Sequence, residues 1–188
     1  KGPDQHLFEV LLRRMGALPI IAEDLGVITT PVEALRDRFE FPGMRILQFA
    51  FGNDDRAAEF RPEGYPAHCC VYTGTHDNDT TVGWFRSEAG PGSTRTAEEI
   101  AAERKMILDY LGTDGREIHW DLIGLGSRSN ANTFVVPLQD LLGLGSEARM
   151  NTPGVAGGNW QWRFTWNQLT DEIRDRFAYV TRATGRMH

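Results

Sequence analysis

The sequence has little cysteine, no excess of basic charge and no long apolar run. The only cysteines among its 188 residues are Cys69 and Cys70, which are adjacent. Adjacent cysteines rarely bond to each other, so they predict buried free thiols and a reducing compartment, the cytoplasm. With 20 basic against 26 acidic residues, the net charge of −6 argues against nucleic acid or an anionic membrane as a partner. No segment approaches the roughly 20 apolar residues of a membrane span.

Several catalytic motifs are absent as well. There is no CxxC, HExxH or calcium-loop spacing, so we predict no metal and no cofactor. There is no G-x-S-x-G nucleophile elbow, which argues against a Ser-His-Asp hydrolase. His76, Asp77 and Asp79 nevertheless offer nitrogen and oxygen ligands, so a metal-dependent hydrolase stays open as a minor alternative.

What the sequence does contain is an alternation of apolar runs with helical patterns. The runs cover residues 18–22, 44–51, 67–72 and 133–138, and we expect helices at 4–15, after Thr30, at 97–112, near 116–125 and from about 170. Thr30-Pro31-x-Glu33 and Thr96-x-x-Glu99 have the spacing of capping boxes, which begin helices. This order predicts an α/β fold of βα repeats around a parallel sheet.

The remaining stretches lack such periodicity. A glycine-proline linker is expected at 89–93, and residues 149–188 read as an aromatic-rich loop followed by a terminal helix. We therefore expect one domain over residues 1–188, without a separate second domain.

Polar side chains follow each of the four apolar runs. They are Glu23 and Asp24, then Asn53 to Asp55, then His76, Asp77 and Asp79, and finally Gln139 and Asp140. The carboxyl ends of parallel strands face the ligand in barrels and open sheets alike. The four ends therefore predict a carboxylate-rich rim.

Each group also has a plainer interpretation. Glu23 and Asp24 could be solvated loop acids, and the Gly-Asn-Asp stretch at 52–54 is ordinary turn chemistry. In TGTHDNDTTVGW, residues 73–84, aspartate and asparagine could cap one another's turns. A histidine placed among them favours a functional site.

Glycoside chemistry fits such a rim. It needs one carboxylic acid that donates a proton and a negative carboxylate near an oxocarbenium-like transition state. Glu23 and Asp77 could supply these roles, while His76 and Asn78 hydrogen-bond sugar hydroxyls. An aromatic row could stack on pyranose rings, although packing against the fold is the commoner use of such side chains. Its members recur at every second residue: Trp160, Trp162, Phe164 and Trp166.

Four blocks together resemble one family. They are IIAEDLGVITTPVEALRDRFEFPGMRILQFAF, YTGTHDNDTTVGW, FVVPLQDLLGLGSEARMN and GNWQWR, and they run from about residue 18 to residue 164. In this order they are similar to the 4-alpha-glucanotransferases, also called amylomaltases or disproportionating enzymes, of glycoside hydrolase family 77. The combination of AEDLG with GTHDND is the most specific part of this resemblance.

The resemblance implies a mechanism. The glutamate of AEDLG is the family's general acid/base, which corresponds to Glu23, and the aspartate of THDND stabilises the transition state, which corresponds to Asp77. His76 would bind the substrate, an α-1,4-glucan or malto-oligosaccharide. We expect Asp24, Asn78 and Asn151 to complete the substrate-binding residues. Transfer would proceed with retention, through a covalent glycosyl-enzyme.

One family motif has no counterpart. The nucleophile is an aspartate in a motif resembling R-I-D-H-F-R-G, which does not occur in these residues. The resemblance therefore implies the C-terminal half, strands 5–8, of a (β/α)8 TIM barrel. We expect this segment alone to be inactive, and to pair with an N-terminal half of the barrel or to self-associate. The alternative is a noncatalytic α-glucan-binding module.

Overall fold

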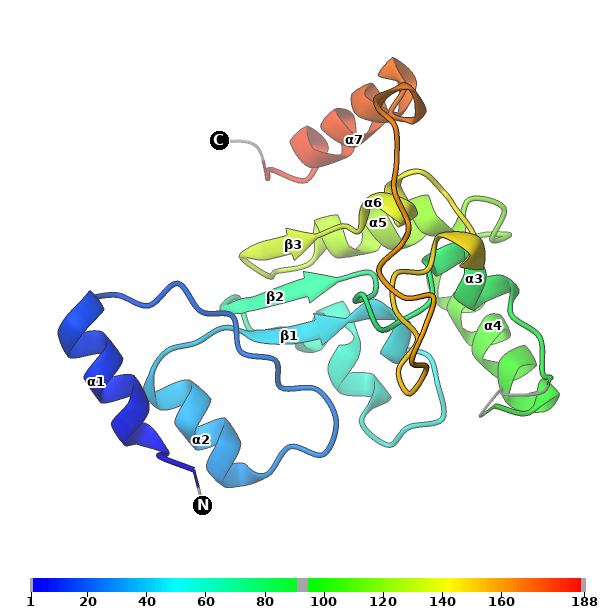
Figure 1. The fold of residues 1–188 in the computed structure, drawn as a ribbon. Coiled ribbons are helices and arrows are strands. Elements are labelled where there is room, and N and C mark those ends of the chain that lie inside the picture. Colours follow the sequence, from blue (N-terminus) through cyan, green and yellow to red (C-terminus); the bar gives the residue numbers. More distant parts are fainter. Residues whose placement is uncertain (1, 91–94, 187–188) are drawn as a thin grey trace.

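A three-stranded parallel sheet lies at the centre of the chain in the computed structural model, which describes residues 2–90 and 95–186 (Figure 1). Strands β1 (Gly43–Ile46), β2 (Cys69–Tyr72) and β3 (Thr133–Val135) lie in the order β1-β2-β3. Met44 pairs with Cys70, and Val71 pairs with Phe134. The α/β fold with parallel βα units is therefore confirmed.

The described residues contain seven α-helices. They are α1 (Gln5–Met15), α2 (Thr30–Arg38), α3 (Thr81–Arg86), α4 (Ala97–Leu111), α5 (Ile118–Arg128), α6 (Leu138–Leu141) and α7 (Asp171–Ala183). Short 3-10 turns are η1 (Leu47–Phe49), η2 (Ala57–Phe60), η3 (Pro62–Gly64), η4 (Ser146–Ala148) and η5 (Trp166–Gln168). Most of the expected linker at 89–93 lies outside the described residues. No helix within them is both long and apolar enough to cross a bilayer.

The two expected capping boxes have different outcomes. At α4, the Glu99 N–H donates to Thr96 Oγ1 at 3.2 Å and the Thr96 N–H donates to Glu99 Oε2 at 2.8 Å, so that box is confirmed. At α2, the N-cap is Thr29 and no side chain caps the helix. The box predicted at Thr30 is therefore wrong, because Thr30 already belongs to the first turn.

The strand expected at 18–22 is also wrong. The Ile20 N–H donates to the Leu18 carbonyl at 2.9 Å, which folds the segment back on itself. Pro19 has no N–H to offer a ladder. One backbone bond reaches the β1 region, from the Ala22 N–H to the Pro42 carbonyl at 2.9 Å. The segment therefore runs toward the start of β1 without becoming a fourth strand.

The core lies between the sheet and helices α4 and α5. Leu47, Val71, Ile107 and Leu122 are fully buried members of one apolar cluster. Cys69 and Cys70 are both free and buried, as expected. Burial raises the pKa of both thiols, which leaves them protonated and unreactive near neutral pH.

The two outer strands of the sheet have unpaired edges, which predicts that the chain associates. Among the described residues, no strand pairs with the outer side of β1 or of β3. Helix α1 has no buried residue, and Val27 and Met15 are 98% and 70% exposed. Unpaired edges and exposed apolar side chains promote association. We expect light scattering at micromolar concentration to give a mass above 21.1 kDa; a stable monomer would contradict this.

Candidate active site

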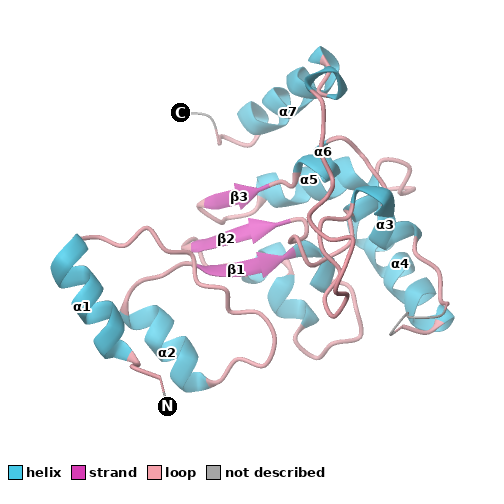
Figure 2. Cartoon of the chain, in the orientation of Figure 1, coloured by secondary structure: helices cyan, strands magenta, loops and turns pink. Residues whose placement is uncertain are grey.

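The carboxyl ends of the three strands open into one cleft. All three arrows point to the same side of the molecule, where the loops that follow them gather (Figure 2). The cleft has a volume of about 1570 Å³. Predicted site residues that line it are Glu23, His76, Asp77 and Asn78, together with Asn53, Asp54 and Asp79 from the expected rim.

The loop at 73–80 is crosslinked by its own hydrogen bonds. Asn78 Oδ1 accepts from the Thr75 N–H and from Thr75 Oγ1, both at 2.8 Å. The Asp77 N–H donates to Thr75 Oγ1 at 3.3 Å, and Thr80 caps α3 by accepting from the Gly83 N–H at 3.0 Å. Several polar side chains of this loop, those of Thr75, Asn78 and Thr80, therefore stabilise the backbone of the loop and the start of α3. The side chains of His76 and Asp77 remain 50% and 47% exposed.

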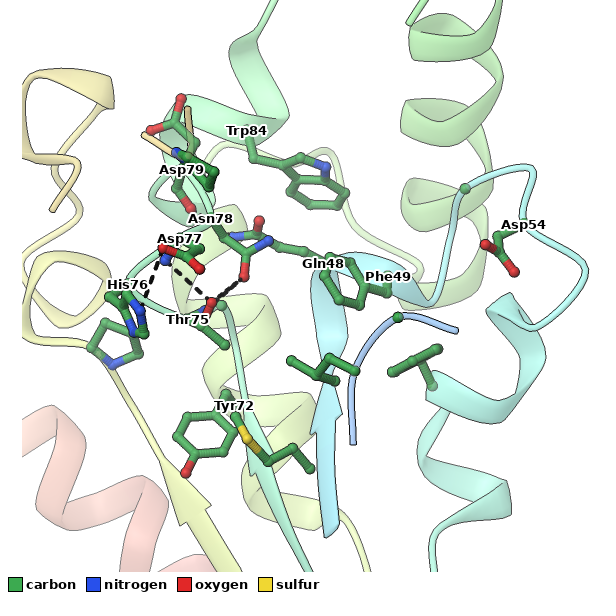
Figure 3. Close-up of a pocket in the computed structure, with 18 of the residues that line it drawn as sticks. Gln48, Phe49, Asp54, Tyr72, Thr75, His76, Asp77, Asn78, Asp79 and Trp84 are labelled. Carbon is green, nitrogen blue, oxygen red and sulfur yellow. Dashed lines mark hydrogen bonds and ion pairs between the residues drawn. The ribbon is translucent and has the colours of Figure 1, made fainter. Parts of the chain in front are cut away.

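Asp77 is held from a distant part of the chain. Asn151 Nδ2 donates to Asp77 Oδ1 at 2.5 Å, and the Asn151 N–H donates to the His76 carbonyl at 3.0 Å. Arg149 donates to the Asp77 carbonyl at 2.6 Å. His76 Nε2 lies 3.4 Å from Asp77 Oδ1, and Figure 3 shows these two side chains facing each other. One carboxylate oxygen, Oδ2, has no partner among the described residues and can receive a ligand.

Glu23 and Asp24 face opposite ways although they are adjacent. Glu23 is exposed, lines the cleft, and has no hydrogen bond or ion pair with any described residue. Asp24 is 9% exposed and does not line the cleft. It pairs with Arg36, accepts from the Met44 N–H at 2.7 Å and lies 3.6 Å from Arg45 Nη1. Asp24 therefore fixes the Glu23 segment to β1 instead of facing a ligand.

Replacing Asp24 tests this anchoring. We expect Asp24→Ala to lower the free energy of unfolding by about 3 kcal/mol, because it removes the buried acceptor of the Met44 N–H and an ion-pair partner of Arg36 and of Arg45, both only partly exposed. Urea denaturation followed by circular dichroism measures the change. Asp37→Asn is the matched control, since Asp37 binds the same Arg36 with a side chain that is 63% exposed. Asp37→Asn should lower the free energy of unfolding by less than about 0.5 kcal/mol. Equal losses in the two variants would contradict an anchoring role for Asp24.

Several residues around the cleft carried no signal in the sequence. Gln48 is 4% exposed, and its Nε2 donates to the Asp79 carbonyl at 3.0 Å. Ser146 donates to Asp79 Oδ2 at 2.6 Å. These contacts, like that of Arg149, join segments far apart in the chain, so no local spacing reveals them. Asp140, expected on the rim, is instead 1% exposed beneath the loop.

The aromatic row divides into two parts. Trp162 stacks on Phe164 with ring centroids 6.3 Å apart, and Phe164 contacts Trp166 at 5.1 Å. Trp160 instead lies 5.1 Å from the His76 ring and is 53% exposed. Its φ of 62° is a left-handed value that costs a tryptophan about 1 kcal/mol or more. Trp160 does not line the main cleft but lines a smaller cavity beside it, next to His76.

The described residues contain no cluster of three or more histidine, cysteine, aspartate or glutamate side chains able to hold a metal ion. The polar side chains that line the cleft are carboxylates, amides, hydroxyls, guanidinium groups and one imidazole. These groups can donate and accept protons and can hydrogen-bond a polyhydroxylated ligand.

Comparison with known proteins identifies this arrangement. The family model described as 4-alpha-glucanotransferase, glycoside hydrolase family 77, matches residues 1–170. The chain belongs to this family. It is 48% identical over 188 residues to a 4-alpha-glucanotransferase of Synechocystis sp., covering 98% of this chain and 35% of that protein. It is 47% identical over 191 residues to one of Thermus thermophilus, covering 100% of this chain and 37% of that protein.

A solved structure supports the same assignment. The amylomaltase from Streptococcus agalactiae, determined in complex with acarbose, matches with a TM-score of 0.86 and 31% identity. The match covers 100% of this chain and 36% of that one. The fold is thus that of part of a TIM barrel, and the chain spans little more than a third of the length of these family members.

Proposed function

We propose that this chain supplies the acid/base and the transition-state-stabilising carboxylate of a 4-alpha-glucanotransferase. The observation that carries the proposal is the joint position of Glu23 and Asp77 on one cleft, each with a free carboxylate oxygen. The substrate would be an α-1,4-glucan or malto-oligosaccharide. The reaction would be a retaining double displacement.

In the first step, Glu23 gives its proton to the glycosidic oxygen of the donor as the C1–O bond breaks. A carboxylate outside these residues attacks C1, and a glycosyl-enzyme forms. In the second step, Glu23 takes the proton of an acceptor 4-hydroxyl, whose oxygen displaces that carboxylate at C1. Asp77 stabilises the positive charge on the sugar ring in both steps.

The other predicted residues would hold the substrate or the catalytic groups. The half-exposed ring of His76 faces the cleft and can hydrogen-bond a sugar hydroxyl. Asn78 uses its Oδ1 within the loop, which leaves its Nδ2 to donate to the ligand. Asn151 does not line the cleft and would act on the substrate by orienting Asp77. Asp24 would act through Glu23, whose backbone it anchors.

The nucleophile of the reaction must come from outside this chain. No residue here corresponds to the family's nucleophile, and a glycosyl-enzyme needs that carboxylate. We therefore propose that these residues need the N-terminal half of the barrel for turnover. Two buried free thiols support a reducing compartment, the cytoplasm; the rice and Arabidopsis relatives are named as chloroplastic or amyloplastic.

A segment exchange tests the function. The matching 191 residues of the Thermus thermophilus 4-alpha-glucanotransferase, 37% of that protein, are replaced by this chain. We expect the chimera to disproportionate maltotriose, with glucose and longer maltodextrins as products, and this chain alone to give none. EDTA should leave the rate unchanged, because no metal takes part. A folded chimera that binds maltodextrin without turnover would favour the noncatalytic glucan-binding module.

A further inference from the structure

The loop that carries His76 and Asp77 is fastened at both ends to one buried side chain, Asp140 of α6. Thr73 Oγ1 donates to Asp140 Oδ2 at 2.5 Å. The Thr81 N–H donates to Asp140 Oδ1 at 2.7 Å, and Thr81 Oγ1 donates to Oδ2 at 2.9 Å. Asp140 is 1% exposed, and both threonines are fully buried.

These three bonds fix the span of the loop. Thr73 follows β2 directly and Thr81 begins α3, so the two residues are the fixed ends between which the loop leaves the sheet. Asp140 belongs to the segment after β3, which also carries Arg149 and Asn151 to the Asp77 backbone and side chain. One carboxylate thus ties the end of β2 to the segment that orients Asp77.

A buried carboxylate is a costly way to fill a core position. Burial raises the pKa of Asp140 even though three donors favour its ionised form. An apolar side chain of similar size would avoid that cost but could not hold Thr73 and Thr81 together. All of the hydrogen bonds that the Asp140 carboxylate makes with described residues go to the two ends of this loop, which indicates a role in its geometry.

We infer that Asp140 is a positioning residue, which sets the place of Asp77 at the cleft by clamping Thr73 and Thr81. The inference rests on the proposed function, since it needs Asp77 to act on the substrate. Asp140 lies behind the loop, where it lines a second, smaller cavity of about 170 Å³. It does not line the main cleft and is not a catalytic group.

The test uses Thr73→Val in the chimera, which keeps the shape of the side chain and removes one hydrogen bond to Asp140. We expect kcat on maltotriose to fall by about 30-fold with KM changed less than about threefold, because small misplacements of catalytic groups cost up to about 100-fold. Thr73→Ser keeps the hydroxyl and should remain within about threefold of the unaltered chimera. The Thr113–Asp121 hydrogen bond, 2.9 Å long and away from the cleft, gives the control Thr113→Val.

A double-mutant cycle separates positioning from general structural damage. If Asp140 acts through Asp77, then Thr73→Val should cost less than about threefold once Asp77→Asn is present. An equal loss in both backgrounds, or a similar loss in Thr113→Val, would overturn the inference. If Thr73→Val does not fold, Asp140→Asn, which keeps an acceptor for the Thr81 N–H, enters the same cycle. An inactive unaltered chimera would instead refute the proposed function.

Discussion

Glu23→Gln should lower kcat of the chimera on maltotriose by about 1000-fold, the loss expected when a general acid/base is removed. Glutamine has nearly the same shape but cannot give a proton to the glycosidic oxygen. Glu23 has no partner among the described residues, so the substitution breaks no internal contact. Glucose release measured over a range of maltotriose concentrations separates kcat from KM.

The control for this change is Glu172→Gln in α7. Glu172 is exposed and lies outside the residues that line the cleft. Glu172→Gln should give the same kcat and melting temperature as the unaltered chimera, within error. If Glu23→Gln kept more than about a tenth of the activity, Glu23 could not be the acid/base, because such groups contribute at least about 100-fold.

Asp77→Asn should lower kcat by about 100- to 1000-fold, because it removes a negative charge that faces the developing oxocarbenium ion. The amide oxygen can still accept from Asn151 Nδ2, so the loop should keep its shape. Steady-state kinetics of the chimera measure the loss, and circular dichroism checks the fold. Asp175→Asn, an exposed change of the same chemistry in α7, is the control. A loss confined to KM would show that Asp77 only binds substrate.

The features of the site that could be predicted from the sequence are those in the loops that lead away from β1 and β2, although β1 itself ends at Ile46 and not at residue 51 as the apolar run suggested. Polar residues after the apolar runs at 44–51 and 67–72 predicted that Asp54, His76 and Asp77 would share a cleft, and they line it together. The reason is simple: parallel strands bring their carboxyl ends to one edge. Glu23 reaches the same cleft although its own segment is not a strand.

The rest depends on contacts that no local pattern records. Glu23 and Asp24 are neighbours in the sequence, yet only packing against Arg36 and Arg45 decides which of them turns inward. The ties of Asp140 to Thr73 and Thr81 span 67 and 59 residues. The left-handed backbone of Trp160 is also invisible in the sequence, since tryptophan rarely adopts it.

The most direct test of the account is azide rescue of Glu23→Ala in the chimera, with α-maltosyl fluoride as donor. Fluoride leaves C1 without a proton from the protein, and azide attacks C1 of the glycosyl-enzyme without needing a base. We expect azide to raise donor consumption by about tenfold or more and to give α-maltosyl azide, because it bypasses both tasks of an acid/base. Unchanged rates and no azide adduct would contradict the assignment of Glu23, and with it the account of this cleft.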